Sequence, residues 1–252
     1  MESFTKDNLK VNIYENRDLM GRGAAIDISL YIHSLLKEKN EISIIFAAAP
    51  SQNDVLKYLV LDKSISWERI NAYHMDEYIG LSDEAKERFS NYLDTHIFKL
   101  VNFKSINYLK PNINNPNEEI ERYSNLLKEN QIDLVVMGVG ENGHIAFNDP
   151  AKGLFSVKEL VKVVKLDEVC RNQQVHDGCF KTLDDVPKFA MTLTIIALCS
   201  ATRLFCVVPG TTKANAIKEM IEGEVTESCP ASILRKHKNA CLYLDKDSSA
   251  LL

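Results

Sequence analysis

The sequence lacks the features that mark several large classes of protein. Its most apolar window, Ile195–Val208, is interrupted by Arg203 and is too short to span a bilayer. The first residues contain no apolar segment of the kind that signal peptides carry. Lys and Arg number 30 against 35 Asp and Glu, so no positive field for nucleic acid is expected. We therefore expect a cytoplasmic protein that binds neither membranes nor nucleic acid.

Cysteine is present but shows no pairing motif. None of the six Cys residues forms a Cys-x-x-Cys pair, and several lie in apolar runs, where Cys behaves as a small hydrophobic residue. This use of Cys is typical of a reduced compartment. The remaining composition, 45% hydrophobic and 26% charged, is that of an ordinary globular protein, and 252 residues favour one large domain.

Short apolar runs alternate with amphipathic segments along the chain. Such alternation predicts buried strands joined by helices in a parallel α/β sheet. The polar stretch 167–187 is poorly periodic and long for a connection, which indicates a lid or binding loop. Asp18 is the predicted N-cap of the first long helix, with an apolar stripe at Ile26, Leu30, Ile32, Leu35 and Leu36. The predicted strands are 12–14, 42–47, 70 to about 75, 134–137, 160–166, 204–208 and 240–244, and the predicted helices are 18–38, 52–61, 84–100, 117–130 and 212–222.

The stretch Ile132–Pro150 joins a predicted strand to a polar loop. Gly138, Gly140 and Gly143 allow the loop to turn sharply and to present N–H groups to an anion, and His144 follows directly. The glycine spacing also matches a dinucleotide-binding motif, but no helix follows, so that alternative is less favoured. A polar loop at the carboxyl end of a parallel strand is where α/β proteins bind ligands.

Two further stretches end strands in polar residues. Asp76 and Glu77 are adjacent, so on extended backbone only one of them faces a given cleft, and the alternative that both cap the next turn stays open. Lys213 follows hydroxyl residues just before a helix, which suits a phosphate. A surface lysine on an N-capped helix is the structural alternative.

Four motifs in order then connect these stretches to a known family. Met75–Leu81, Gly138–Pro150, Val186–Thr192 and Gly210–Ala214 closely resemble motifs of the glucosamine-6-phosphate deaminase (isomerase) family, and the resemblance continues through Pro230–Ser232. It implies a Rossmann-like, doubly wound α/β fold, with a mostly parallel sheet, helices on both faces and one domain over residues 1–252. The related 6-phosphogluconolactonases share the fold and a similar Gly-His loop.

The resemblance also implies a chemistry, the conversion of an amino-sugar phosphate to a ketose phosphate with loss of ammonia. Asp76 would move a proton between C2 and C1, which a carboxylate can do when burial raises its pKa. His144 and Asp149 would assist opening of the sugar ring, and Ser51 and Lys213 would bind the phosphate. The family needs no metal and no redox cofactor. We expect the catalytic residues and Lys213 to converge on one cleft at the carboxyl edge of the sheet.

The sequence departs from the family in the phosphate-binding segments. The first phosphate loop is Ala48–Gln52, where two glycines are absent and Pro50 removes an N–H donor. A phosphate-binding Arg of the family aligns within His176–Gly178, which contains none. Arg171 or Lys181 would have to substitute.

The histidine loop departs as well. Asn142 stands where the family has an acid beside the histidine, and Asp149 is one methylene shorter than the family's Glu. These changes leave Asp76 untouched, so a divergent sugar-phosphate enzyme is favoured. A lactone hydrolase, in which His144 activates water, and a non-catalytic sugar-phosphate sensor remain alternatives. The sugar phosphate itself, and whether the chain is a monomer or a homo-oligomer, stay open.

Overall fold

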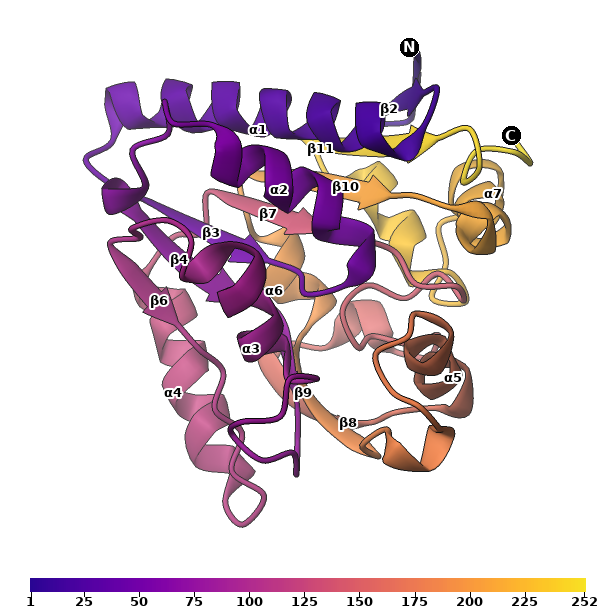
Figure 1. Ribbon diagram of the computed structural model, residues 1–252. Coiled ribbons are helices and arrows are strands. Elements are labelled where there is room, and N and C mark those ends of the chain that lie inside the picture. The colour runs from indigo at the N-terminus through magenta and orange to yellow at the C-terminus, as the bar shows by residue number, and fades with distance from the viewer.

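A large twisted sheet forms the centre of the computed structural model, which describes residues 1–252 (Figure 1). The spatial order of its strands is β1-β2-β11-β10-β7-β3-β4-β6, and every neighbouring pair is parallel except β1 with β2. The strands are β1 (Glu2–Lys6), β2 (Leu9–Tyr14), β3 (Ile42–Phe46), β4 (Ile70–His74), β6 (Ser105–Asn107), β7 (Leu134–Met137), β10 (Arg203–Val208) and β11 (Ala240–Asp245).

The central strands are apolar throughout because helices cover both faces of this sheet. In β7, Leu134 and Val136 enter one hydrophobic cluster and Val135 and Met137 enter the other. Residues of α1, α2 and α3 belong to the first cluster, and residues of α4, α6 and α7 to the second. The expected doubly wound α/β fold is confirmed. The helices are α1 (Arg17–Glu38), α2 (Asn53–Leu61), α3 (Phe89–Leu93), α4 (Pro116–Glu129), α5 (Glu168–His176), α6 (Ile195–Cys199) and α7 (Ala214–Glu222).

A second, smaller sheet was not predicted from the sequence. It contains three antiparallel strands in the order β5-β9-β8, and it lies beyond the β4 side of the large sheet (Figure 1). Its strands are β5 (Asp76–Tyr78), β8 (Val161–Lys165) and β9 (Phe189–Leu193). The segment from residue 70 onward therefore contributes strands to both sheets. β4 belongs to the large sheet, and Asp76 begins β5 of the smaller sheet instead of ending β4.

The predicted apolar stripe of the first helix is only partly correct. Ile32 and Leu36 are buried as expected, but Leu30 is 63% exposed and Ile26 is 51% exposed. Half of the buried residues of α1 are small, which allows close packing against α2. A Cβ on Gly21 would lie 2.4 Å from the Cβ of Asp54, so the backbones approach too closely for a larger residue.

Several predicted boundaries also change. The N-cap of α1 is Asn16, whose side chain accepts a hydrogen bond from Leu19 N at 3.0 Å, so Asp18 lies in the first turn. The predicted edge strand 12–14 is part of β2, which has neighbours on both sides. The segment 84–100 contains only the short α3 and a π-helical turn at Asp94–Phe98. No helix in the structure combines the length and apolarity needed to cross a membrane.

The chain reverses its winding direction between β3 and β7. From β3 it proceeds outward through β4 to β6, then returns to β7 and winds the other way through β10 and β11. The loops after β3 and β7 consequently diverge at this point and leave a crevice at the carboxyl ends of the strands. In open α/β sheets this switch point is the usual ligand site.

Candidate active site

A cavity of about 250 Å³ lies at this switch point. It is lined by the loops that follow β3, β4, β7 and β10, together with residues from α1 and α5. Five of the residues predicted from the sequence line it, from four separate segments of the chain: Ser51, Asp76, Gly140, His144 and Lys213. Of the four residues predicted to converge on one cleft, Asp76, His144 and Lys213 line the cavity, although Asp76 belongs to the smaller sheet. The fourth, Asp149, does not line it and contacts His144 instead.

Asp76 presents a carboxylate without hydrogen-bond partners from the protein. It is the first residue of β5, where it pairs with Thr192 of β9, and it is only 7% exposed. Burial raises the pKa of the Asp76 carboxyl well above its usual range, and the neighbouring charge of Glu77 adds to the shift. A carboxylate with a raised pKa in a cavity has the properties of a general base.

Glu77 points to the opposite side of β5 and has a structural role. Its carboxylate accepts hydrogen bonds from Phe89 N and Ser90 N at 3.0 Å and from Ser90 Oγ at 2.7 Å, so it caps the start of α3. The pleat of the strand thus separates the two acids. The capping alternative holds for Glu77 and does not hold for Asp76.

His74, which was not predicted as a site residue, fixes the backbone next to Asp76. The ring is fully buried, and its Nε2 accepts a hydrogen bond from Leu109 N at 2.8 Å. The proton must therefore be on Nδ1, which donates to the carbonyl oxygen of Asp76 at 2.9 Å. Burial lowers the pKa of His74, which keeps this tautomer neutral. His74 is a positioning residue for Asp76.

The glycine loop after β7 holds the His144 ring flat against the backbone. Gly140 N donates to the carbonyl oxygen of His144 at 2.9 Å. A Cβ on Gly140 would lie 2.1 Å from the imidazole, so only glycine fits beneath the ring. Gly143 adopts a positive φ of 81° in the turn and does not line the cavity. Its predicted contact with the ligand is therefore replaced by a role in the turn.

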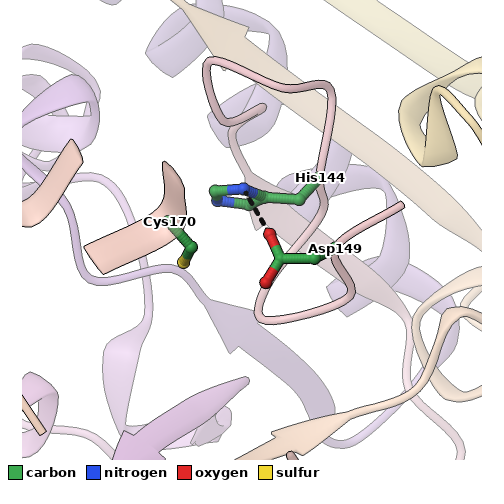
Figure 2. Close-up of side chains that lie close together, drawn as sticks. All are labelled: His144, Asp149 and Cys170. Atoms are coloured by element: carbon green, nitrogen blue, oxygen red, sulfur yellow. Dashed lines mark ion pairs between the residues drawn. The ribbon is translucent and has the colours of Figure 1, made fainter. Parts of the chain in front are cut away.

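Asn142 and Asp149 both contact the same nitrogen of His144 (Figure 2 shows the pair with Asp149). His144 Nδ1 lies 2.7 Å from Asn142 Oδ1 and 3.2 Å from Asp149 Oδ1. Both oxygens are acceptors, so Nδ1 carries a proton and Nε2 is left with a lone pair. Neither Asn142 nor Asp149 lines the cavity, so each acts through the imidazole.

The charge of Asp149 is maintained by these neighbours. Burial works to raise the pKa of Asp149, but the hydrogen bonds from His144 and Asn142 outweigh it and hold that pKa below its usual value. Asn142 Nδ2 donates to Asp149 Oδ1 at 3.1 Å, while Asn142 Oδ1 contacts His144 Nδ1, so one amide bridges the acid and the imidazole. Asp149 therefore supplies the carboxylate that Asn142 lacks.

Cys170 lies beside this pair, from the first turn of α5 (Figure 2). One side-chain ligand atom from each of His144, Asp149 and Cys170 can be chosen so that all three lie within 4.8 Å of one another, a set of the kind that binds metals. Burial raises the pKa of the Cys170 thiol, which keeps it protonated. No motif around Cys170 in the sequence indicated this cluster.

Lys213 carries a buried cation without a partner. It is 4% exposed, and its Nζ makes no hydrogen bond. Burial lowers the pKa of the Lys213 ammonium, while the charges of Asp177 and Glu141 act in the opposite direction. A buried ammonium without a hydrogen-bond partner is costly, so this site is suited to an anion or another acceptor.

A second basic residue, which was not predicted from the sequence, contacts the loop after β3. Arg17, at the start of α1, lines the cavity and donates to the carbonyl oxygen of Pro50. It also forms an ion pair with Asp54 at 2.5 Å. Ser51 Oγ lies nearby and accepts a hydrogen bond from Gln52 Nε2 at 3.0 Å. The only feature of the sequence that could have indicated Arg17 is its position next to Asp18, the predicted N-cap.

Arg171 does not reach the cavity. Its guanidinium donates to the carbonyl oxygens of Leu183 at 2.5 Å and Val186 at 3.0 Å, which ties α5 to the segment before β9. The cavity is lined instead by Gln173 and Gln174 of α5 and by Asp177 directly after it. The stretch predicted as a lid or binding loop therefore does face the cavity, but as a helix.

Comparison with known proteins identifies the family. Residues 15–243 match the family described as glucosamine-6-phosphate isomerases/6-phosphogluconolactonase. Glucosamine-6-phosphate deaminase of Lactobacillus delbrueckii subsp. bulgaricus is 30% identical over 245 residues, which cover 97% of this chain and 100% of that protein. The enzyme of the same name from Exiguobacterium sibiricum is 31% identical over 229 residues, covering 91% of this chain and 88% of the relative.

Solved structures agree in fold. A monomeric glucosamine-6-phosphate deaminase superposes with a TM-score of 0.86 at 26% identity, covering 96% of this chain and 99% of that one. A 6-phosphogluconolactonase from Thermotoga maritima superposes with a TM-score of 0.76 at 19% identity, covering 94% and 100%, which shows the shared fold. The chain belongs to the family of glucosamine-6-phosphate isomerases and 6-phosphogluconolactonases.

Proposed function

We propose that this protein is an amino-sugar-phosphate deaminase, which converts glucosamine 6-phosphate or a related amino-sugar phosphate to a ketose phosphate and ammonia. The observation that carries the proposal is the Asp76 carboxylate, buried in the cavity with a raised pKa and no partner from the protein. His144 and Lys213 line the same cavity. The relatives at about 30% identity are named glucosamine-6-phosphate deaminases, which favours this activity over lactone hydrolysis.

Asp76 would carry the central proton transfer on the open-chain sugar. The ionised carboxylate removes the proton from C2, and the electrons of the C–H bond form a C1–C2 double bond. The C1 carbonyl oxygen takes a proton from the C2 ammonium of the substrate and becomes a hydroxyl. Asp76 then returns the proton to C1, which leaves an imine at C2. Water adds to this imine and ammonia leaves, so that a ketone remains at C2. A base with a raised pKa suits both directions of this transfer.

His144 would open the sugar ring before that step. Its Nε2 lone pair can accept the proton of the C1 hydroxyl, and the imidazolium can then protonate the ring oxygen as the C1–O bond breaks. The positive charge that develops on the His144 imidazole is stabilised by Asp149, whose Oδ1 lies 3.2 Å from Nδ1. The loops at the far end of the cavity, with Ser51 and Lys213, would bind the phosphate. We place this chemistry in a single cytoplasmic domain.

The direct test is turnover of glucosamine 6-phosphate, followed both as ammonia release and as ketose phosphate formed. We expect both products in equal amounts from the purified chain. Hydrolysis of 6-phosphogluconolactone is measured on the same preparation. Hydrolysis without any ammonia release would replace the deaminase with the lactonase, in which His144 activates water.

The roles of Asp149 and Asn142 are separable by exchanging their side chains. Asp149→Asn leaves two amides at His144 Nδ1 and is expected to slow turnover of the cyclic substrate by about tenfold or more, because the imidazolium loses its counter-charge. The double variant Asn142→Asp with Asp149→Asn places one carboxylate at the same nitrogen again and should recover much of the rate. Neither change should affect an already open-chain substrate. Equal losses on both substrates would contradict a role in ring opening.

A further inference from the structure

Two groups of opposite charge line the cavity without pairing with each other. Lys213 Nζ has no partner, and Asp177 lines the same cavity from the turn that follows α5. No ion pair joins them within 4.0 Å, and the Asp177 carboxylate accepts only a long hydrogen bond from Gln173 Nε2, at 3.3 Å. The acid is nevertheless close enough for its charge to act on Lys213.

The other basic side chain that lines the cavity is already paired. Arg17 forms an ion pair with Asp54 and donates to the carbonyl oxygen of Pro50. Glu141 also acts on Lys213 through its charge, but it does not line the cavity. Apart from Asp76, an incoming group therefore meets one unpaired cation, Lys213, and one unpaired anion, Asp177. Such a pair attracts a phosphate dianion much less than a cluster of cations would.

Two glutamine side chains at the cavity wall have amide oxygens that accept no hydrogen bond from the protein. Gln52 is fully buried, and its Nε2 donates to Ser51 Oγ and to the carbonyl oxygen of Val207, which fixes the orientation of the amide. Its Oε1 is left without a donor. The Gln174 side chain lines the cavity and makes no hydrogen bond with the protein. Gln52 Oε1 is closed off from the cavity, but a sugar hydroxyl can donate to the Gln174 amide oxygen, whereas a phosphate dianion has no proton to give.

We propose that Asp177 is a specificity-determining residue that offsets the charge of Lys213, so that the cavity accepts amino sugars with a free distal hydroxyl alongside amino-sugar phosphates. One hydroxyl can donate to Asp177 and accept from Lys213 at the same time. A dianion gains from Lys213 but is repelled by Asp177, and like charges brought together are a strong means of discrimination. This inference rests on the proposed function only in taking the cavity as the sugar site.

The test compares binding of two non-reacting probes by calorimetry, 2-amino-2-deoxyglucitol and its 6-phosphate. The quantity measured is the ratio of the two dissociation constants, which isolates the contribution of the phosphate. In the wild-type chain we expect the phosphate to improve affinity by less than about tenfold. Asp177→Asn keeps the size of the side chain and removes its charge, and should raise this ratio by about tenfold or more.

Asp184→Asn is the matched control, because it makes the same charge change at an exposed position away from the cavity. It should leave the ratio unchanged. A ratio that Asp177→Asn leaves unchanged or lowers would overturn the inference. Because the probes do not react, the outcome is separable from the activity: if the ratio shifts while no amino sugar releases ammonia, the specificity role of Asp177 stands and the proposed deaminase fails.

Discussion

Replacing Asp76 by asparagine is expected to slow turnover of an amino-sugar phosphate by about 10²–10⁴-fold, the usual contribution of a general acid–base group. The amide keeps the shape of the side chain but cannot accept the C2 proton, so substrate binding should be largely retained. Single-turnover rates and the dissociation constant of an open-chain analogue measure the two effects separately. A variant with a near-wild-type rate would exclude Asp76 as the base.

The same substitution should stabilise the folded protein at neutral pH. The folded pKa of Asp76 is raised above the ordinary value of 3.8, so ionisation is easier in the unfolded chain. Below pH 3.8 both states are protonated and the acid causes no loss; as pH rises from 3.8 through the folded pKa, the wild type progressively loses stability. The asparagine variant avoids this loss.

Unfolding of both proteins by denaturant from about pH 4 to 8 should therefore show a gap that widens with pH. A gap that stays constant would mean that the ionisation of Asp76 is not its source. When a residue is retained for catalysis at the expense of stability, its replacement is expected to lower activity and raise stability together.

Lys213→Met is expected to lower kcat/KM for a phosphorylated amino sugar by about a hundredfold, mainly through KM. Lys213 Nζ is the only unpaired cation that lines the cavity, and loss of one member of a buried, hydrogen-bonded charge pair usually has a large effect on affinity. The ligand-free variant should be at least as stable as the wild type, because the ammonium is buried without a partner.

Lys218→Met is the control for this change. Lys218 lies on α7, the helix that begins directly after Lys213, but its side chain is 52% exposed and its partner, Glu222, is 4.0 Å away at the surface. Its loss should leave kcat/KM unchanged. If both methionine variants weaken the enzyme to the same extent, the effect arises from α7 and not from an anion site.

Six of the eight strands of the large sheet and three of the site residues were predictable because local sequence determines them. Leu134–Met137 can only be a buried element, and the polar residues that follow such a strand lie at its carboxyl end in any parallel sheet. His144 and Lys213 are placed by this rule alone. Asp76 was found as well, although the antiparallel pairing of β5 with β9 depends on a strand more than a hundred residues later in the chain.

The missed elements are those in which tertiary packing replaces hydrophobic periodicity. The buried side chains of α5 include Cys170, Gln173 and Gln174, so no apolar stripe marks the helix. Its one local sign was Asp167, whose side chain caps Cys170 N at 2.7 Å. In α1 small residues such as Ala24 share the buried side with Met20 and Ile28, while Ile26 and Leu30 of the predicted stripe are exposed. Arg17 and Asp177 enter the cavity only through such packing.

The contact between His144 and Gly140 has a consequence for the entropy of catalysis. Because the imidazole lies directly on the main chain and its Nδ1 is held by two acceptors, the ring has no rotational freedom left to lose when a sugar arrives. That ordering is completed during folding and does not recur at each turnover. Asn142→Asp, which keeps both acceptors at Nδ1, should therefore preserve the position of the ring, whereas substitution of Gly140 should not be tolerated.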